Sequence, residues 1–588
     1  MTLAFLDWVV VGVFFAVTLG IGWWAARRAK SSPEDYFLSG REMPWWLLGV
    51  SMVATTFAAD TPNFVTQQVR ENGVSGNWVW WSFILGSMAT VFIFARLWRR
   101  SHVVTDVELY ELRYGGKPAA FLRGFRALYL GIIFNVLVMG NVCLAGVKFG
   151  EIVLGIDGWV MLSGSGVIVL FYSVLGGLRG ILFTDLFQFF FALGGAILAA
   201  ILLVGHSDVG GWEAMLSNEL VQEKMNIFPD MSDASVWVPM LFIPLAVQWW
   251  GSSYPGAEPG GGGYVVQRML AAKDESHSMR AVLLFYFAHY VLRPWPWIVV
   301  GLASLVAFPT LAEMQAAFPG MSAEFVKDDA AYPAMLTLLP RGILGLVAAS
   351  LIAAFMSTMS TQVNLGASYF VNDLYKRFFK PEASAKHLIV VARVVTVVMV
   401  VLASISGLVL ESADQAFQYM LLLTAGSGGV LILRWFWWRI SAYTEIVAMV
   451  GSLVVAAVLA FGVDFPETAA GNAERICWGV GVTTLLWLGS VFITPGTEKR
   501  TLEAFYRLTR PGGPGWGPVK EGMKNVPEQP DSLGVGVSCA FLGSLAMVLS
   551  LVGIGYGVYG EVVVAGGCLL GALGFGGGTW WFWRRGEG

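Results

Sequence analysis

Long apolar runs separated by short polar segments dominate the hydrophobicity pattern of this chain. Runs of roughly 18 to 30 predominantly apolar residues are long enough to cross a lipid bilayer as helices. We therefore expect about fifteen membrane spans, near residues 6–27, 44–70, 76–98, 119–153, 158–175, 181–205, 235–257, 277–309, 335–378, 384–411, 416–436, 442–463, 472–494, 531–556 and 558–583. The run at 335–378 is longer than one crossing needs, so its helix should extend beyond the lipid.

Basic residues follow every second span, and this alternation predicts the orientation of the chain. Lys and Arg collect after the odd-numbered spans, within 27–41, 99–126, 179, 268–280, 376–380, 434–439, 499–510 and 584–585. The segments after the even-numbered spans are acidic on balance. Because Lys- and Arg-rich loops remain in the cytoplasm, we expect a multi-pass cell-membrane protein with an extracytoplasmic N-terminus and a cytoplasmic C-terminus. The first span should be retained, because its basic residues follow the apolar run, the reverse of a signal peptide.

Composition narrows the function further. Of the 588 residues, 13% are charged and 56% hydrophobic, whereas soluble proteins carry about 25% charged residues. A net charge of -3 offers no basic surface for nucleic acid. The cysteines and histidines lack metal-binding spacings, and no nucleophile and base cluster in the sequence, so we expect no enzyme activity. The expected partners are the bilayer and a small-molecule solute, with no nucleic acid and no obligate protein partner.

Polar and helix-breaking segments divide the chain. We expect an N-terminal extra helix with the first cytoplasmic loop (1–43), a first repeat (44–234), a second repeat (235–440), two further helices (441–500), a cytoplasmic linker (501–530) and a C-terminal helical hairpin (531–588). The Gly- and Pro-rich stretch 511–518 indicates flexibility in that linker. The glycine run 258–263 is not followed by the GK[ST] of a phosphate-binding loop, so we interpret it as a mobile cytoplasmic loop.

Two of the predicted spans carry helix breaks at membrane depth. The second span contains Asp60, Thr61 and Pro62, and the proline should free carbonyl groups one turn upstream to face a cation. The seventh span contains Pro244 followed by Gln248. Each interrupted helix opens a set of five spans, a pattern typical of inverted-repeat transporters that bind their solute near the midplane of the membrane.

Hydroxyl and charged side chains within other spans are the next candidates. Ala354, Ser357, Thr358 and Thr361 share one face of the ninth span, with Ser360 beside them. Serine and threonine oxygens are hard, neutral ligands suited to an ion such as sodium, although the same residues often hydrogen-bond a preceding turn or join two helices.

Three charged or titratable residues at membrane depth also need an explanation. Asp185 begins the sixth span, where the helix dipole alone would explain an acidic residue. Arg293 near the middle of the eighth span needs a partner, for which Asp60 is the natural candidate. His289 in the same span is, by itself, more often a packed core residue than a ligand.

The chain resembles the sodium:solute symporter family, which includes sodium-coupled transporters of glucose and galactose, proline, and sialic acid. The matching motifs are Asp35 to Arg41, Tyr172 to Leu178 with Thr184, Asp185 and Gln188, Gln267-Arg268 with Ala271 to Lys273, and Ala354 to Thr361 followed by Asn364 and Asp373 to Tyr375. They occur in order across roughly residues 1–440. The resemblance implies an all-α, leucine-transporter-like core of five plus five inverted helices, preceded by one extra helix and followed by additional helices.

The resemblance also implies ion and solute positions. The principal sodium site would use the carbonyl groups of Ala54, Phe57 and Ala354 with the hydroxyls of Ser357 and Thr358. A second sodium site, present in relatives resembling sialic acid transporters, would use Asp185, Ser357, Ser360 and Thr361. Solute positions fall on Asp60, Thr61, Gln248, Trp249, Trp250, His289 and Leu421, and we add Arg293 as a further candidate because of its charge at membrane depth.

The solute itself stays open at this level. Leu421 is apolar where a sugar carrier has an amide. Trp249 and Trp250 would stack on a sugar ring, and Arg293 or His289 would hold a carboxylate, although an aromatic belt and a structural arginine explain the same residues equally well. We therefore expect a sodium-coupled symporter of a polar solute, either a sugar or a carboxylate, that works by alternating access. A sensor that binds sodium and solute without transport and a proton-coupled symporter are the alternatives.

Overall fold

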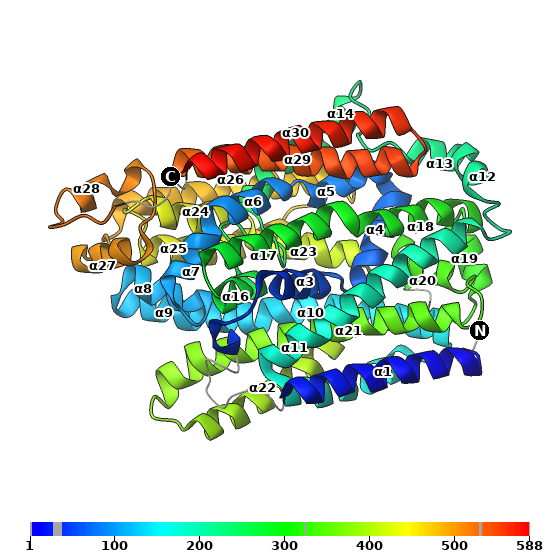
Figure 1. Cartoon of the computed structure of the whole chain (residues 1–588), viewed down its shortest axis with the longest axis horizontal. Helices are drawn as coiled ribbons and strands as arrows, with labels where there is room; N and C mark the ends of the chain where they lie inside the picture. Colours follow the sequence, from blue (N-terminus) through cyan, green and yellow to red (C-terminus); the bar gives the residue numbers. More distant parts are fainter. Residues whose placement is uncertain (1–2, 27–37, 323–324, 529–531, 587–588) are drawn as a thin grey trace.

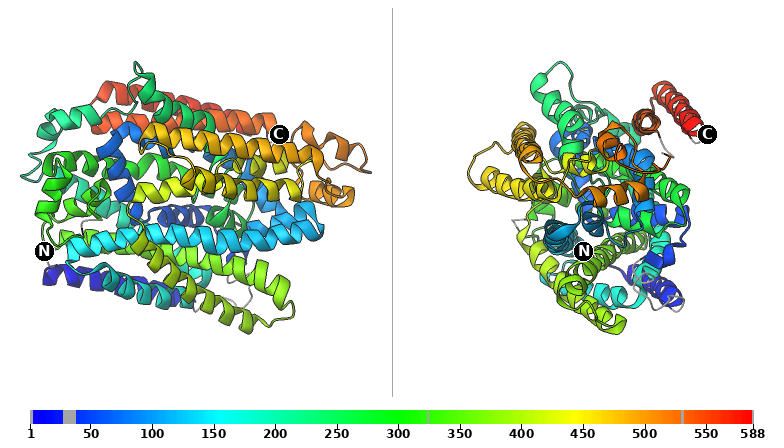
Figure 2. Two further views of the ribbon diagram at one scale, coloured as in Figure 1. Left: turned by 180° about the vertical axis from the view of Figure 1, so that it is seen from behind. Right: turned by 90° about the vertical axis from the view of Figure 1, so that its left-hand side faces the viewer.

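The computed structural model describes residues 3–26, 38–322, 325–528 and 532–586. These residues form helices and no β-strand. The long helices run side by side along the long axis of the molecule, with the N-terminus at one end and the C-terminus towards the other (Figures 1 and 2).

Twelve helical segments of the described residues are long and apolar enough to cross a membrane, or up to thirteen if a bent pair counts as one. Six of them are single helices: α1 (Phe5–Ala26), α22 (Ala385–Val409), α25 (Ala442–Phe461), α26 (Ala469–Ile493), α29 (Leu533–Val558) and α30 (Val562–Gly586). One more, Leu178–Val204, is part of α11 (Gly158–Val204). The other five are segments that contain shorter helices: Val74–Ser101 contains α5 (Trp78–Trp81), α6 (Ile84–Ala89) and α7 (Ala95–Ser101); Gly116–Leu154 contains α9 (Gly116–Leu128) and α10 (Asn135–Phe149); Ala234–Gly251 contains α14 (Ala234–Trp237) and α15 (Trp249–Gly251); Glu275–Ala307 contains α17 (Glu275–Phe287) and α18 (Pro294–Ala307); and Ile343–Phe379 contains α21 (Ile343–Ser368). The bent pair is α23 (Ala413–Thr424) and α24 (Gly428–Phe436), at 46°.

The expected count of fifteen exceeds thirteen, the number obtained when the bent pair counts as one span, at two places. The span at 44–70 is divided into α3 (Trp45–Thr56) and α4 (Asp60–Asn72). The span at 158–175 lies within the single element α11, and the side chains at 171–177 lie outside the described residues. The motif side chains from Tyr172 to Gly177 and the residues 35–37 also lie outside them.

Shorter helices complete the described structure, and π-helical turns interrupt several spans. The shorter helices are α8 (Leu109–Tyr114), α12 (Trp212–Ser217), α13 (Glu219–Lys224), α16 (Gly263–Ala271), α19 (Leu311–Ala317), α20 (Ala331–Leu336), α27 (Lys499–Thr509) and α28 (Gly517–Lys520). The π-helical segments are η3 (Thr90–Phe94), η5 (Tyr129–Phe134), η6 (Gly150–Leu154), η7 (Val238–Phe242), η8 (Pro244–Gln248), η9 (Ala288–Leu292) and η12 (Tyr369–Phe379).

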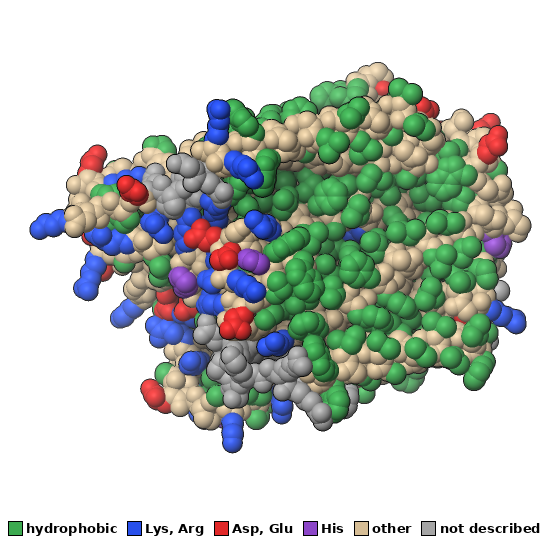
Figure 3. All heavy atoms as spheres, in the orientation of Figure 1, with side chains coloured by type: hydrophobic (Ala, Val, Ile, Leu, Met, Phe, Trp, Pro, Cys, Tyr) green, Lys and Arg blue, Asp and Glu red, His purple; other side chains and the backbone are tan. Residues whose placement is uncertain are grey.

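Charge is distributed unevenly over the surface. In Figure 3, Lys and Arg side chains gather at the end of the molecule that carries α7, α8 and α27, whereas hydrophobic side chains cover most of the rest of this face. The C-terminus lies towards this basic end, and the N-terminus lies at the opposite end (Figure 1). Lipid would solvate the apolar face, and water the basic end.

Both predicted interruptions are present. Helix α3 ends at Thr56 and α4 begins at Asp60, so the break lies where Pro62 predicted it. In the seventh span the helix continues through Pro244 as the π-helical segment η8 and stops after Gly251. Helix α16 resumes at Gly263, which leaves eleven intervening residues without regular helix.

The glycine run 258–263 belongs to this second break, so the expectation of a mobile loop was wrong. Gly260 to Gly262 are buried. The carbonyl of Gly260 accepts a hydrogen bond from the Trp98 indole N–H at 2.8 Å, and the Gly263 amide donates to Asp106 at 3.0 Å. Gly260, Gly261 and Gly263 have positive φ angles of 77°, 82° and 56°, which glycine adopts without steric cost. The glycines therefore allow a tight, packed connection.

The stretch 511–518 is also ordered, in contrast to the flexible linker that its composition predicted. The Trp516 side chain is fully buried. Its indole N–H donates to the Trp435 carbonyl at 2.8 Å, its ring lies 5.8 Å from that of Phe505, and the Arg113 guanidinium covers it at 4.9 Å. A tryptophan in a glycine- and proline-rich segment thus anchors the segment on the basic end of the bundle.

Replacement of this anchor should destabilise the protein. We expect Trp516→Ala to lower the free energy of unfolding by about 3 to 5 kcal/mol, because it empties a fully buried aromatic site. Thermal unfolding of the purified protein in detergent would measure the change. Trp580→Ala on α30 is the control, since that side chain is 56% exposed; an equal shift in both variants would contradict the anchoring role.

Candidate functional site

The break after α3 frees two carbonyl groups from helical hydrogen bonding. Phe57, with φ −79° and ψ 52°, leaves the helical conformation. Among the hydrogen bonds of the described residues, none ends on the carbonyl oxygen of Ala54 or Phe57. Buried carbonyl groups are normally paired, so these two are available acceptors. They are the carbonyl groups that the family resemblance assigns to the principal sodium site.

The hydroxyl face of α21 meets the same break. The Thr358 hydroxyl, 303 residues away in sequence, donates to the carbonyl of Thr55 at 2.8 Å and lies 3.1 Å from the carbonyl of Ala354. The Ser357 hydroxyl donates to Asp185 at 2.7 Å. Because each hydroxyl gives its hydrogen to another group, its oxygen lone pairs remain available. Carbonyl and hydroxyl oxygens are the donors that a hard cation prefers, so these residues fit sodium.

Asp185 lies at the centre of a buried polar cluster. Its carboxylate accepts hydrogen bonds from Ser51 at 2.5 Å and from Ser357 at 2.7 Å. The Arg268 guanidinium lies 3.9 Å from it, and both side chains are fully buried. Arg268 donates to Thr361 at 3.0 Å. The cluster therefore joins α3 to α11, α16 and α21, three elements that carry matched motifs.

The residues of the predicted second sodium site differ in their placement. Asp185, Ser357 and Thr361 belong to this cluster, but Thr361 reaches Asp185 through Arg268. The Ser360 hydroxyl donates to the Ser357 carbonyl of its own helix at 3.1 Å. The structure thus brings three of the four residues together, with the buried guanidinium of Arg268 between them. The second site stays a prediction.

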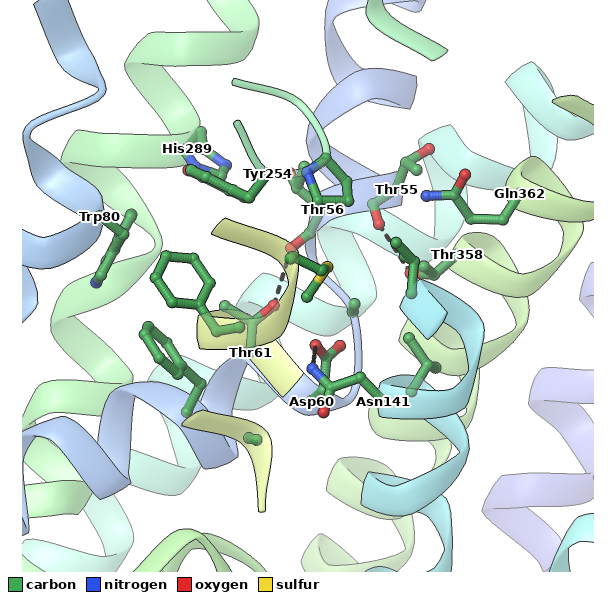
Figure 4. A pocket seen from close by; sticks show the side chains of 18 of the residues that line it. Thr55, Thr56, Asp60, Thr61, Trp80, Asn141, Tyr254, His289, Thr358 and Gln362 are labelled. Atoms are coloured by element: carbon green, nitrogen blue, oxygen red, sulfur yellow. Dashed lines mark hydrogen bonds between the residues drawn. The ribbon is translucent and has the colours of Figure 1, made fainter. Parts of the chain in front are cut away.

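A cavity opens beside the break. Figure 4 shows its polar side chains converging from several helices. The lining residues are Thr55, Thr56, Ala58, Asp60, Thr61, Phe64, Trp80, Val138, Asn141, Val142, Tyr254, Pro255, Tyr264, His289, Arg293, Thr358, Gln362, Ala413, Phe417 and Met420. Thr55 and Thr358 belong both to this lining and to the contact between α3 and α21, so cavity and ion ligands are adjacent.

Four of the predicted solute residues lie in this cavity. Asp60 accepts a hydrogen bond from the Asn141 side chain at 2.7 Å (Figure 4). The Thr61 hydroxyl donates to the Thr56 carbonyl at 3.2 Å. The ring nitrogen Nε2 of His289 lies 3.0 Å from the Tyr254 hydroxyl. His289 is therefore part of the cavity wall and more than a packed core residue.

Arg293, the fourth, does not form the expected ion pair with Asp60. The ion pairs within 4 Å among the described residues do not include these two side chains. Instead Arg293 donates to the carbonyl of Thr56 at the end of α3 and to the carbonyl of His289 at 3.2 Å. Its remaining nitrogen lies 3.4 Å from the His289 ring. The guanidinium is thus occupied by the backbone of the broken helix.

The other four predicted solute residues lie outside the lining of the cavity. Gln248 donates to the carbonyl of Val79. The Trp250 indole N–H donates to Ala246 of its own helix, and Trp249 lies against Gly86. Leu421 is fully buried beside the lining residue Met420. The geometry gives these four no support as solute ligands.

Sequence reasoning missed several polar lining residues. Asn141, Tyr254, Tyr264, Gln362 and Trp80 all face the cavity. Two of them had a sequence signal: Asn141 is an amide within a long apolar run, and Gln362 follows Thr358 by one helical turn. The two tyrosines flank the glycine-rich break, a position that only the folded chain makes meaningful.

Several buried polar atoms of the cavity have no hydrogen-bond partner in the described structure. They are Asp60 Oδ1, Asn141 Oδ1, His289 Nδ1 and the Tyr264 hydroxyl. The first two only accept hydrogen bonds, and Tyr264 both donates and accepts. A buried carboxylate oxygen without a partner is costly, so the cavity is complementary to a ligand that supplies hydrogen-bond donors.

Comparison with known proteins places the chain among membrane transporters. Residues 36–454 match the model of the sodium:solute symporter family. The sodium/glucose cotransporter of Vibrio parahaemolyticus is 28% identical over 480 residues, covering 78% of this chain and 86% of the relative. The sodium/mannose cotransporter SLC5A10 of Bos taurus is 25% identical over 486 residues, covering 77% and 79%.

A solved structure supports the same architecture. A Na⁺-coupled sialic acid symporter in a substrate-bound, outward-open state superimposes with a TM-score of 0.66. The sequences are 20% identical, and the match covers 84% of this chain and 99% of the other. This likeness concerns the arrangement of the helices.

Proposed function

The chain belongs to the sodium:solute symporter family, and from its site we propose that it imports a small, neutral, hydroxylated solute together with sodium. Its fold is all-helical and leucine-transporter-like, as the motifs implied. One observation carries the proposal: the freed carbonyl groups of α3 meet the hydroxyl face of α21 at the edge of a buried polar cavity. Interrupted helices of this kind hold coupling ions and solute near the midplane of transporters.

Sodium would bind where α3 and α21 meet. The carbonyl oxygens of Ala54, Phe57 and Ala354 and the hydroxyl oxygens of Ser357 and Thr358 would hold it, and its positive charge would join the two helices. A second ion would occupy the region of Asp185, with Ser357, Ser360 and Thr361. In both cases the ion is transported cargo. The sodium gradient and the membrane potential drive it inward, and a potential of 100 mV contributes about 2.3 kcal/mol for each charge moved.

The cavity favours a hydroxylated solute over a carboxylate. Asp60 presents a free carboxylate oxygen, which attracts hydroxyl hydrogens and repels a second carboxylate. Arg293 is the charged group that a carboxylate would seek, but its nitrogens are engaged by Thr56 and His289. Aromatic rings at Trp80, Phe417 and Tyr254 supply the apolar faces on which a sugar ring packs. The names of the relatives cited above, glucose and mannose cotransporters, agree with this class.

Transport would follow alternating access. Solute and sodium enter from the extracytoplasmic side. They stabilise the arrangement of α3, α4, α21 and the helices α15 and α16 of the second break that is closed to the outside. Release of sodium at the opposite side weakens the contact between α3 and α21. The ligands must bind one state more tightly than the other to shift the equilibrium. The collection of Lys and Arg at the end near the C-terminus supports assigning that end to the cytoplasm.

Uptake into proteoliposomes tests the proposal directly. We expect radiolabelled sugars and polyols to accumulate only under an inward sodium gradient, and carboxylate solutes such as proline or sialic acid not to compete. Binding without gradient-driven accumulation would favour the sensor. Accumulation driven by a proton gradient in the absence of sodium would favour proton coupling.

Asn141 provides a test of the solute contact. We expect Asn141→Ala to raise the KM for the best sugar roughly 2- to 12-fold, the effect of losing one hydrogen bond, with little change in sodium dependence. Asn372→Ala is the control, because this amide bonds Ser368 outside the cavity. Equal KM values in Asn141→Ala and wild type would remove Asn141 from the solute site.

A further inference from the structure

A second cavity lies next to the solute cavity, towards the basic end of the molecule. It extends along α8, α9, α21 and α24. Val138, Pro255, Tyr264 and Gln362 line both cavities. A ligand that passes this shared wall moves from one cavity directly into the other. We refer to the second cavity as the inner chamber.

The inner chamber is lined by balanced charges. Asp106 and Glu258 contribute carboxylates, and Arg126 and Arg434 contribute guanidinium groups. Arg434 is 4% exposed and lies 3.7 Å from Glu445, behind the wall. The wall therefore presents both signs of charge without a strong excess, so the chamber does not select for a net charge on its ligand.

Several polar atoms of this lining lack hydrogen-bond partners. Asp106 accepts the Gly263 amide at 3.0 Å with one oxygen, while its other oxygen is buried without a hydrogen bond. The Tyr369 hydroxyl, which faces Asp106, and the Nε of Arg434, whose side chain lies beside Tyr110, are also buried without a hydrogen bond of good geometry. The chamber thus offers an acceptor, a donor and a group that does both. Buried groups of this kind gain free energy when a ligand or water satisfies them.

We propose that the inner chamber is a second binding site for the transported solute, occupied after the solute leaves the central cavity. This inference rests on the proposed function and extends it. The ligand is of the same class, a neutral polyhydroxylated molecule. Its hydroxyls both donate and accept, which matches Asp106, Arg434 and Tyr369, and its ring faces pack on aromatic side chains such as Phe134 and Tyr110.

A site on the inner side has an asymmetric kinetic signature. Solute that enters from the cytoplasmic side meets the inner chamber first, whereas external solute meets the central cavity first. Loss of chamber contacts should therefore weaken the apparent affinity for internal solute and leave the external KM nearly unchanged. Loss of a central contact should alter both.

The experiment compares uptake with efflux in proteoliposomes of one orientation. The probes are radiolabelled glucose, galactose, mannose and myo-inositol, and the variants are Asp106→Asn, Tyr369→Phe and their combination. Asp106→Asn retains an oxygen for the Gly263 amide, and Tyr369→Phe removes only the hydroxyl that faces Asp106. We expect the combination to raise the half-saturating internal concentration at least fivefold, with the external KM within twofold of wild type.

Two further variants separate the possible outcomes. Tyr375→Phe is the control, because its hydroxyl bonds His387 outside the chamber at 2.9 Å; both constants should stay unchanged. Asn141→Ala in the central cavity should raise both constants. If the chamber variants leave the internal constant unchanged, or raise both constants equally, the second site is refuted while the symporter stands. If wild type accumulates none of the four probes, the proposed solute class fails first.

Discussion

Thr358→Ala should abolish most sodium-driven uptake. The substitution removes a hydroxyl that bonds the Thr55 carbonyl at 2.8 Å across the break in α3 and that is assigned to the principal sodium site. Loss of groups that orient a metal ion commonly lowers affinity or activity 10- to 100-fold, and we expect the sodium concentration for half-maximal uptake to rise by roughly this factor. Initial uptake rates over a range of sodium concentrations would measure it.

Two matched variants control this result. Thr358→Ser keeps the hydroxyl and should retain sodium dependence close to wild type. Ser350→Ala removes a hydroxyl from the same helix, and among the described residues that hydroxyl donates to the carbonyl of Val347, one turn away, at 2.7 Å. A loss of sodium affinity in Ser350→Ala as large as in Thr358→Ala would show that any change in α21 perturbs transport and would remove the assignment.

Asp185→Ala should strongly destabilise the folded protein. Asp185 and Arg268 are both fully buried, and removal of one member of a buried ion pair typically costs 3 to 5 kcal/mol, because the other charge remains without compensation. We expect a lower melting temperature of the purified protein. The double variant Asp185→Ala/Arg268→Met removes both charges. It should recover much of the lost stability, because an apolar pair leaves no buried charge without a partner.

The same residue tests the second sodium ion. Asp185→Asn keeps the shape of the side chain and one acceptor oxygen but removes the charge. If Asp185 binds an ion, sodium activation of uptake should change from a cooperative curve in wild type to a hyperbolic curve. The stable double variant should also be hyperbolic, which separates ion binding from folding. Unchanged sodium dependence in Asp185→Asn would remove the basis for a second ion.

Local patterns predicted the groups around the break in α3 better than the residues that line the cavity. The carbonyl groups of Ala54 and Phe57 are freed by a break that a single proline signals, and the hydroxyls of α21 share a face by helical periodicity alone. The solute cavity, by contrast, is assembled from residues of several helices. Four predicted residues lie in it and four do not, because whether a side chain lines a cavity depends on the rotation and tilt of its helix.

The sequence by itself determined the class of this protein, its membrane-spanning helices and the break at Asp60, because bilayer thickness and backbone hydrogen bonding act over one or two helical turns. Only the tertiary structure decided which distant groups meet. Asn141 binds Asp60 across 81 residues, Arg293 binds the Thr56 carbonyl instead of Asp60, and Trp516 is buried in a segment whose composition indicated flexibility. Such contacts arise when helices pack, and their partners are therefore set by helix geometry rather than by spacing along the chain.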